Sequence, residues 1–387
     1  MTVARAHVLL VTGFLLAICT TTASAEPKFL SKQYPRCTSC HYSPTGGGPL
    51  TAYGRSLSHR ELSTFGEPLP SHDDTTTRDT TKPEPGEESF LFGAFGKSLD
   101  NLQLGIFTRP SYLHYSFPGF SDDRNLLMNA DLHAAYRYND WTFYGQLGRE
   151  LDEDTGHFKL DSSEYWIGRQ PEEGLGFRVG RFLPAYGIRF ADHTSYNREF
   201  LELAQYDQIL GAELSYSRGR YLTQVSLGPG RAQTIIEENG GAAFTTTGRF
   251  QIDLTPRTVV AASGVFRDGT DFEARQGSTG VAFGYAPTSH VTTWTQFDGQ
   301  FIDGQDATSY VFVNETSFEV YRGIWAVVSP QARFGGGEQL PDLLRLGLGA
   351  VLLPRTHFNV NVSYYRDRDR SNDITTNIFL AQFHLYL

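Results

Sequence analysis

From about Phe90 to Leu387 the sequence is a regular series of strand-like segments separated by turns, and this regularity constrains the fold more than any other feature. Within many segments apolar residues alternate with polar or small ones, as where Leu344 and Leu346 alternate with Arg345 and Gly347. Alternation with a period of two gives a strand one apolar and one polar face. Sixteen strands are predicted, at about 100–115, 124–138, 140–150, 157–169, 175–184, 207–217, 220–229, 243–254, 257–267, 274–285, 289–301, 308–320, 322–335, 342–353, 356–367 and 374–387.

The connections between these segments alternate between short turns and longer polar loops. Asn139–Asp140 and Pro256–Arg257 are short, whereas Gly228–Gly241 and Asp268–Arg275 are long. An even number of strands with short turns on one side is typical of outer-membrane β-barrels. The pattern therefore predicts an all-β fold, a transmembrane barrel of roughly sixteen strands around an aqueous lumen, with outer-membrane lipid against its apolar face. A large soluble β domain with one solvated face is the alternative.

Composition agrees with β structure and excludes one class of partner. Tyr occurs 20 times, Phe 28 times and Gly 39 times, and these residues suit pleated surfaces and turns. The formal net charge is −10. A nucleic-acid partner is not expected, because binding it requires a basic face.

The first 25 residues read as an export signal. A polar start with Arg5 precedes the apolar run Val8–Cys19, and Ala23–Ala25 supplies a small-x-small cleavage site before Glu26. The run is too short to cross a bilayer as a helix. Lipid attachment at Cys19 is disfavoured because Ile18 is bulky where a small residue is needed.

Only two cysteines remain after this signal, and they belong to the sequence Cys37-Thr38-Ser39-Cys40-His41. This is the C-x-x-C-H attachment pattern for c-type haem: two thiols add to the porphyrin vinyl groups, and the adjacent His ligates the iron. A redox disulfide would be expected within a βαβ pattern, and a zinc site would need further Cys or His ligands nearby. The sequence thus predicts one covalently bound haem c at Cys37 and Cys40, with His41 as proximal iron ligand.

The haem segment is expected to span residues 26–66, to be mostly helical or irregular, and to connect through a disordered linker, residues 67–89, to the barrel, residues 90–387. Arg55 is a candidate contact for a haem propionate, with a solvated surface position as the alternative. His59, in an expected short helix at 56–63, is the candidate sixth ligand of the iron. An open iron site or a His from the barrel remain alternatives. Because so short a chain cannot cover a haem alone, the segment is expected to pack against the rest of the protein.

The barrel lumen is the expected place for that packing. With an even strand number both barrel ends lie in the periplasm, so the haem segment starts beside the periplasmic mouth and could enter the lumen as a plug. The longest connection, Ala185–Tyr206, is expected to fold inward as a constriction loop. His193 in this loop and His133 on the second strand are possible haem neighbours, although each is more simply a pore-lining residue.

The signal peptide, the segment Pro27–His41 with its single C-x-x-C-H, and the barrel that follows together resemble the fused monohaem cytochrome–porins of outer membranes. That group includes iron-oxidising cytochromes. The resemblance implies an electron-transfer protein in the outer membrane of a Gram-negative bacterium, with its haem on the periplasmic side or in the lumen. It implies a periplasmic c-type cytochrome or other electron carrier as one partner and an extracellular redox substrate, such as ferrous iron, as the other.

Two functions follow from the sequence. The first is electron transfer across the outer membrane, with Fe(II) oxidation as one form of it and no substrate-converting active site. The second is a diffusion porin in which the haem segment acts as plug, sensor or anchor. A hydrolytic enzyme would need a positioned nucleophile and base, and the sequence contains no convincing set of such residues.

Overall fold

The computed structural model describes residues 27–46, 48–58, 62–65, 101–151, 158–169, 171, 174–190, 192, 194–201, 203, 207–229, 244–268, 275–304, 308–335, 340–355 and 358–386. The expected export signal, the expected linker, Cys19, His59 and His193 all lie outside these residues.

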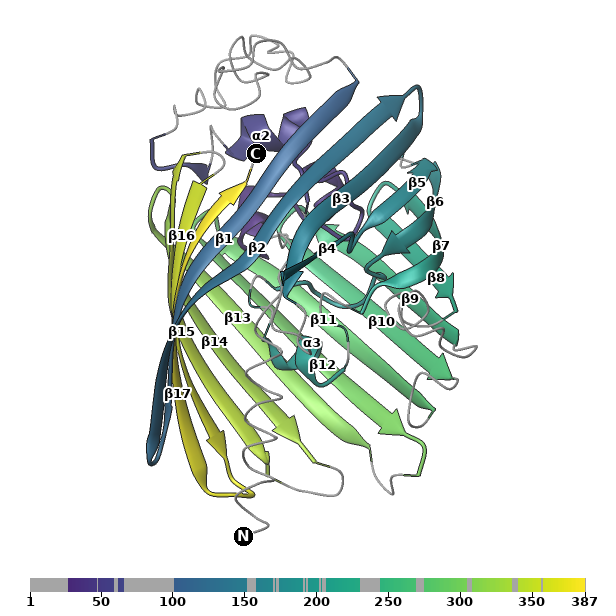
Figure 1. The fold of residues 1–387 in the computed structure, drawn as a ribbon. Coiled ribbons are helices and arrows are strands. Elements are labelled where there is room, and N and C mark those ends of the chain that lie inside the picture. The colour runs from purple at the N-terminus through teal and green to yellow at the C-terminus, as the bar shows by residue number, and fades with distance from the viewer. Residues whose placement is uncertain are drawn as a thin grey trace.

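The described strands form one closed antiparallel sheet (Figure 1). Each strand pairs with its neighbours in the sequence, and the first pairs with the last, with Phe107 opposite Tyr386 and Ser111 opposite Gln382. The strands are β1 Leu102–Phe117, β2 Phe120–Tyr138, β3 Trp141–Leu151, β4 Phe158–Asp161, β5 Tyr165–Arg169, β6 Gly174–Phe182, β7 Ile209–Arg218, β8 Tyr221–Gly228, β9 Phe244–Thr255, β10 Thr258–Asp268, β11 Gln276–Thr288, β12 Val291–Ile302, β13 Ser309–Tyr321, β14 Ile324–Phe334, β15 Leu343–Arg355, β16 Phe358–Asp369 and β17 Ile374–Tyr386.

β4 and β5 are two parts of one interrupted strand, because both pair with β3. The interruption at residues 162–164 is closed locally, since the Gln146 N–H donates to the Glu164 carbonyl at 2.9 Å. Counted in this way the barrel has sixteen strands. The predicted fold class is therefore confirmed, and most strand ends agree with the predicted ones to within about three residues.

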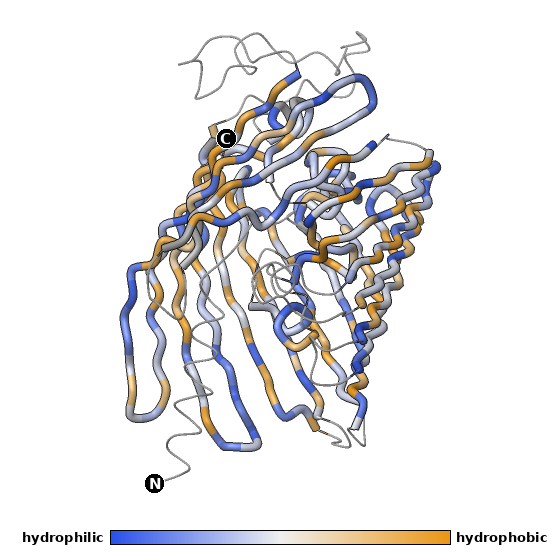
Figure 2. The backbone as a smooth tube through the Cα atoms, turned by 45° about the vertical axis from the view of Figure 1, so that its right-hand side comes forward, coloured by the Kyte–Doolittle hydropathy of each residue, from blue (hydrophilic) through white to orange (hydrophobic). Residues whose placement is uncertain are grey.

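Hydrophobic and hydrophilic residues alternate along the strands (Figure 2), and their exposures show that they lie on opposite faces of the wall. On β15, Leu346 and Leu348 are 47% and 48% exposed, whereas Arg345 is buried at 2%. The same holds on β17, where Phe383 is exposed and Gln382 and His384 are buried. The outer surface is thus apolar and faces lipid, and the polar face lines the lumen.

One barrel mouth carries short turns, and we call it the short-turn mouth. The turns between β2 and β3, β7 and β8, and β13 and β14 lie there, and each joins its strands through two residues. The expectation of long loops at the opposite mouth is wrong for one hairpin, since β1 and β2 are joined only by Pro118 and Gly119. Gly119 has φ +84°, a conformation that glycine adopts without strain, so the two strands extend to a tight turn.

The N-terminal segment, residues 27–65, contains two short 3₁₀ helices, η1 (Pro27–Lys32) and η2 (Cys37–Ser39), and the α-helix α2 (Ala52–Leu57). Its purple ribbon lies at the upper end of the barrel in Figure 1. A fourth short helix, α3 (Tyr196–Glu199), belongs to the connection between β6 and β7 and lies inside the barrel. None of the helices in the described residues is long and apolar enough to cross a membrane.

Replacement of Leu348 by Arg tests the assignment of the outer surface. Leu348 points outward near the middle of β15, so the arginine would enter the apolar part of the bilayer. We expect the free energy of unfolding from lipid vesicles to fall by about 2–4 kcal/mol, the usual cost near the bilayer midplane. Leu348→Phe is the matched control and should change stability little. Equal stability of the two variants would contradict a lipid-facing position.

Candidate functional site

The N-terminal segment lies across the lumen and is bound to well-separated parts of the wall. Lys32 Nζ forms an ion pair with Glu319 of β13 at 2.5 Å. Arg36 Nε donates to Asp253 of β9 at 2.8 Å. The Thr64 N–H donates to the Leu353 carbonyl of β15 at 2.7 Å. Arg36 also donates to the carbonyl of Gly219, in the turn between β7 and β8, which places the segment at the short-turn mouth.

The cysteine motif forms a single helical turn within this segment. The Cys37 carbonyl accepts from the Cys40 N–H at 3.2 Å and from the His41 N–H at 3.0 Å, so the three residues are held on one turn. Thr51 then caps α2, since its side chain accepts from the Gly54 N–H. A Cβ on Gly54 would lie 2.4 Å from the Cys40 carbonyl oxygen, so only glycine lets α2 pack against the motif.

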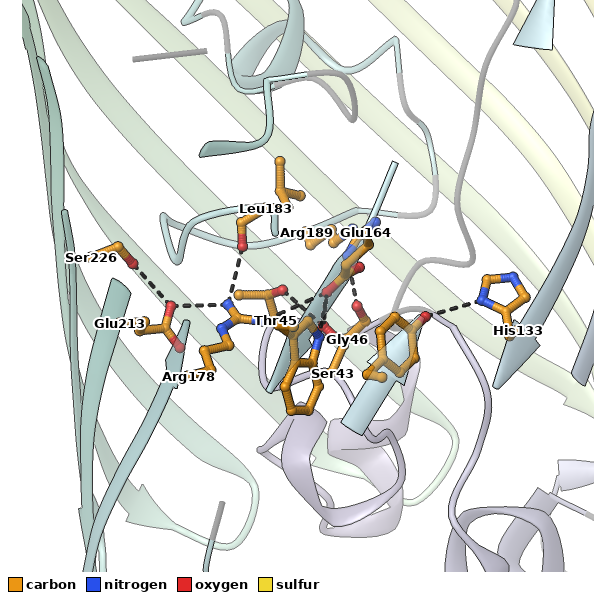
Figure 3. A network of polar contacts seen from close by, with 12 residues as sticks. Ser43, Thr45, Gly46, His133, Glu164, Arg178, Leu183, Arg189, Glu213 and Ser226 are labelled. Atoms are coloured by element: carbon orange, nitrogen blue, oxygen red, sulfur yellow. Dashed lines mark hydrogen bonds and ion pairs between the residues drawn. The ribbon is translucent and has the colours of Figure 1, made fainter. Parts of the chain in front are cut away.

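The residues directly after the motif are fixed to the wall by a network of polar contacts (Figure 3). Ser43 donates to Glu164 at 3.0 Å, and Arg189 donates to the Gly46 carbonyl at 2.7 Å. Behind Glu164, Arg178 is fully buried and forms ion pairs with Glu164 at 3.6 Å and Glu213 at 3.0 Å. The position of the motif is therefore set by charges on the barrel wall.

The connection between β6 and β7 spans residues 183–208, and its described residues fold into the lumen as expected; we call it the constriction loop. Its Ile188 N–H donates to Gln296 of β12 at 2.7 Å, and its Tyr196 N–H donates to Gln331 of β14 at 2.7 Å. Arg345 of β15 donates to the Thr194 carbonyl. The loop therefore crosses from β6 to the opposite wall, and the N-terminal segment lies beside it.

A partly open cavity of about 810 Å³, open solvent included, separates the constriction loop from the motif, and we call it the motif cavity. Cys37, Cys40 and His41 all line it, and no disulfide joins the two cysteines. The other side chains that characterise it are aromatic residues and arginines: Phe29, Tyr34, Tyr186, Trp294, Arg36, Arg189, Arg198 and Arg249. Among the described residues that line the cavity there is no Asp or Glu.

Burial and positive charge have opposite effects on the pKa of the Cys37 thiol in this cavity. Burial raises the pKa of the Cys37 thiol, while the charges of Arg249, Arg189 and Arg198 act to lower it. Burial, reinforced by the charge of Arg189, lowers the pKa of Arg198 to about 9. The cavity is therefore positively charged, and an anionic group would be stabilised in it.

A second cavity of about 590 Å³ lies on the other side of the motif and shares Phe29, Cys40 and His41 with the motif cavity. His384 of β17 lines it. The His384 ring is 7% exposed, lies 4.4 Å from the Phe107 ring and has Nδ1 3.2 Å from the Asn359 amide nitrogen. The second cavity thus contains a buried histidine of the wall, and a barrel histidine is one of the alternative iron ligands that the sequence leaves open.

The structure brings only some of the predicted haem-binding residues together in one cavity. Cys37, Cys40 and His41 share one cavity, as the motif requires. Arg55 lines neither cavity, because its guanidinium donates to Gln103 on β1. His133 is buried on the lumen side of β2 with Nδ1 3.0 Å from the Tyr144 hydroxyl, and it also lines neither cavity.

The arginines of the motif cavity were missed by sequence reasoning. Arg189 and Arg198 lie in the constriction loop and Arg249 lies on β9. The only available signals were the basic residues of the loop and the inward register of Arg249 on its strand, and neither indicates that the three meet.

No protein-family model matches the sequence, and no curated protein matches it. Among solved structures, OmpF of Salmonella typhi in complex with daunomycin is similar, with a TM-score of 0.57 at 11% identity, over 74% of this chain and 98% of that chain. A loop-deletion mutant of OmpT, an outer membrane protein of Vibrio cholerae, is similar with a TM-score of 0.52 at 12% identity, over 74% of this chain and 100% of that chain. At these identities the similarity establishes a porin-like barrel fold alone.

Replacement of Arg178 by Met tests the network that holds the motif. The variant would leave the carboxylates of Glu164 and Glu213 buried without their shared cation. We expect a loss of about 3–5 kcal/mol in the free energy of unfolding, as for other broken buried ion pairs, measured by denaturant titration in detergent. Arg169→Met is the control, because Arg169 pairs with Asp140 at the exposed surface and should contribute at most about 1 kcal/mol. Similar losses in both variants would contradict the prediction.

Proposed function

We propose that the chain carries one covalently bound haem c inside the barrel, attached at Cys37 and Cys40 with His41 as proximal ligand, and that it passes electrons across the outer membrane. The observation that carries this proposal is the position of the motif. Both thiols and the imidazole open onto one cavity within the lumen, between the N-terminal segment and the constriction loop.

The residues of the motif cavity fit such a group in three respects. The helical turn at Cys37–His41 brings two thiols and an imidazole to the same cavity. Aromatic side chains from both the segment and the wall, among them Phe29 and Trp294, provide apolar surface for a porphyrin. Arginines in the same cavity provide cations for its carboxylates.

The barrel supplies the surface that the short N-terminal segment lacks for covering a haem. Residues 27–65 cannot cover a haem alone, but the wall and the constriction loop supply further sides of the motif cavity. These sides reduce contact with water and lower the local dielectric, so charges close to the cavity have a strong effect on a bound redox group. When bound, the haem supplies a one-electron carrier.

The direction of the barrel suggests which partner lies on which side. The motif lies near the short-turn mouth, which is the periplasmic side in barrels of this kind. A periplasmic c-type cytochrome or another electron carrier would exchange electrons there. An extracellular redox substrate, with ferrous iron as one candidate, would meet the opposite mouth. The location is thus the outer membrane of a Gram-negative bacterium, with the haem in the lumen.

The sixth ligand of the iron is not among the described residues of the motif cavity, which contain no histidine besides His41. His59 lies outside the described residues. His384 faces His41 across a different space, the second cavity, and is the wall alternative. An open site on the iron is the third.

A diffusion channel is the second candidate function, and the porin-like barrel with its constriction loop supports it. A protein similar in fold, with a TM-score of 0.50 at 10% identity, is an anion-selective porin from Comamonas acidovorans, and it matches 74% of this chain and 99% of its own. In this chain the N-terminal segment would then act as a plug. Its attachment to β9, β13 and β15 opposes free passage of solutes at the short-turn mouth.

Haem staining of the chain tests the redox proposal. In membranes from cells that mature c-type cytochromes, we expect haem to remain on the denatured wild-type chain and to disappear in Cys37→Ala/Cys40→Ala, because the thioether bonds cannot form. Ser39→Ala, which changes an exposed residue inside the motif and keeps its spacing, is the matched control. Electron flux into vesicles that contain a reducible dye should be present in the variants that keep haem and absent in the double variant. Flux that persists in the double variant would contradict electron transfer through this haem as the function.

Conductance in planar bilayers separates the two functions. We expect the full-length chain to conduct weakly and deletion of residues 27–65 to increase conductance several-fold, because the deletion opens the short-turn mouth. Retention of the β-sheet circular dichroism spectrum would control for folding. High conductance of the full-length chain, unchanged by the deletion, would contradict the plug and favour a simple diffusion channel.

A further inference from the structure

Two arginines of the motif cavity, the buried Arg198 and the partly buried Arg249, have only neutral hydrogen-bond partners among the described residues. Arg198 is 5% exposed, and its guanidinium donates to the carbonyls of Ile188 at 2.9 Å and Leu203 at 3.3 Å. Arg249 donates to the side-chain oxygens of Gln251 at 2.6 Å and Gln224 at 3.4 Å. The Nε atom of each is buried and has no hydrogen-bond partner in the described structure.

Two other buried arginines of the lumen are neutralised directly by carboxylates. Arg178 forms an ion pair with Glu213 at 3.0 Å. Arg345 holds Asp367 through two parallel contacts of 2.7 and 2.8 Å. The difference is chemical, because amide and carbonyl oxygens satisfy hydrogen bonds but do not cancel a charge. Arg198 and Arg249 form no ion pair with the described residues. The carboxylates that act on them, Asp298 on Arg198 and Asp253 and Glu213 on Arg249, lie beyond ion-pair distance, and burial still outweighs them. Positive charge held in this way is costly for a folded protein.

The geometry of the cavity indicates which kind of ligand would compensate the charge of Arg198 and Arg249. Arg198 comes from α3 of the constriction loop, and Arg249 from β9 on the wall, yet both line the motif cavity with Cys37 and His41. A ligand with two anionic groups, or one planar anion shared between two guanidinium forks, would neutralise both.

We propose that Arg198 and Arg249 form a carboxylate-binding site in the lumen, occupied by the two propionates of the attached haem. The assignment of the occupant rests on the proposed function; the site itself does not. A small dicarboxylate that enters the lumen from solution has the same chemistry and is the other possible source. In either case the ligand joins the constriction loop to the barrel wall, so the site also holds the loop in place.

Succinate titration distinguishes the two sources. The detergent-purified Cys37→Ala/Cys40→Ala chain, which cannot attach haem, should bind succinate in isothermal titration calorimetry. Arg198→Gln and Arg249→Gln in that background should each weaken binding at least tenfold, and Arg169→Gln, at the exposed surface, should not. Wild-type chain with attached haem should not bind succinate if the propionates fill the site. Binding to that wild type as well would support the site and assign it to a free anion.

Absence of succinate binding to the haem-free chain would overturn the carboxylate site, and so would binding unaffected by either arginine substitution. If the double cysteine variant does not fold, the reduction potential of the haem-loaded single variants replaces the titration. Loss of a neighbouring positive charge should lower that potential in Arg198→Gln and Arg249→Gln but not in Arg169→Gln, and unchanged potentials would overturn the proposal. If the wild-type chain carries no haem, it serves as the titrated protein itself, so a failure of the redox function does not hide the result for the site.

Discussion

The structure depends on the requirement that backbone N–H and C=O groups be hydrogen-bonded within an apolar layer, where no water can replace a missing partner. The pairing of β1 with β17 satisfies that requirement, because it removes both edges of the sheet. Closure also separates the two faces of the sheet into an outer surface and a lumen surface. The face towards lipid is apolar, and the polar face is left to line an interior too wide for the wall's own side chains to fill.

That polar interior is the environment in which the N-terminal segment folds. The three described helices of the segment are short, but the segment buries Leu30, Tyr42 and Leu62 in apolar clusters with wall residues. Ion pairs and hydrogen bonds add to this packing, such as those of Lys32 with Glu319 and Arg36 with Asp253. Because these partners lie on different strands, the position of the cysteine motif depends on the closed wall.

The same interior explains the concentration of charge near the motif. Arg178 is balanced by carboxylates, and this balanced group anchors Ser43 beside the motif. Arg198 and Arg249, in contrast, are held by neutral oxygens and face the cavity. A protein that keeps such charge buried obtains a strong field at one point of the lumen, which suits the binding of an anionic ligand or the tuning of a redox group.

The sequence alone determined the barrel, and it predicts the haem chemistry of the motif. Strand positions follow from period-two alternation and turn residues, which are local signals, and the cysteine spacing is local as well. The tertiary structure decided everything that depends on which distant residues meet across the lumen. It turned Arg55 towards Gln103, joined Arg189 and Arg198 of the loop to Arg249 of β9, and brought His384 from the last strand to a cavity shared with His41. The physical reason is that side chains on opposite walls of a closed sheet become neighbours only through closure and through the inward fold of the constriction loop. The sequence predicts both of these features, but local patterns do not indicate which side chains they bring together.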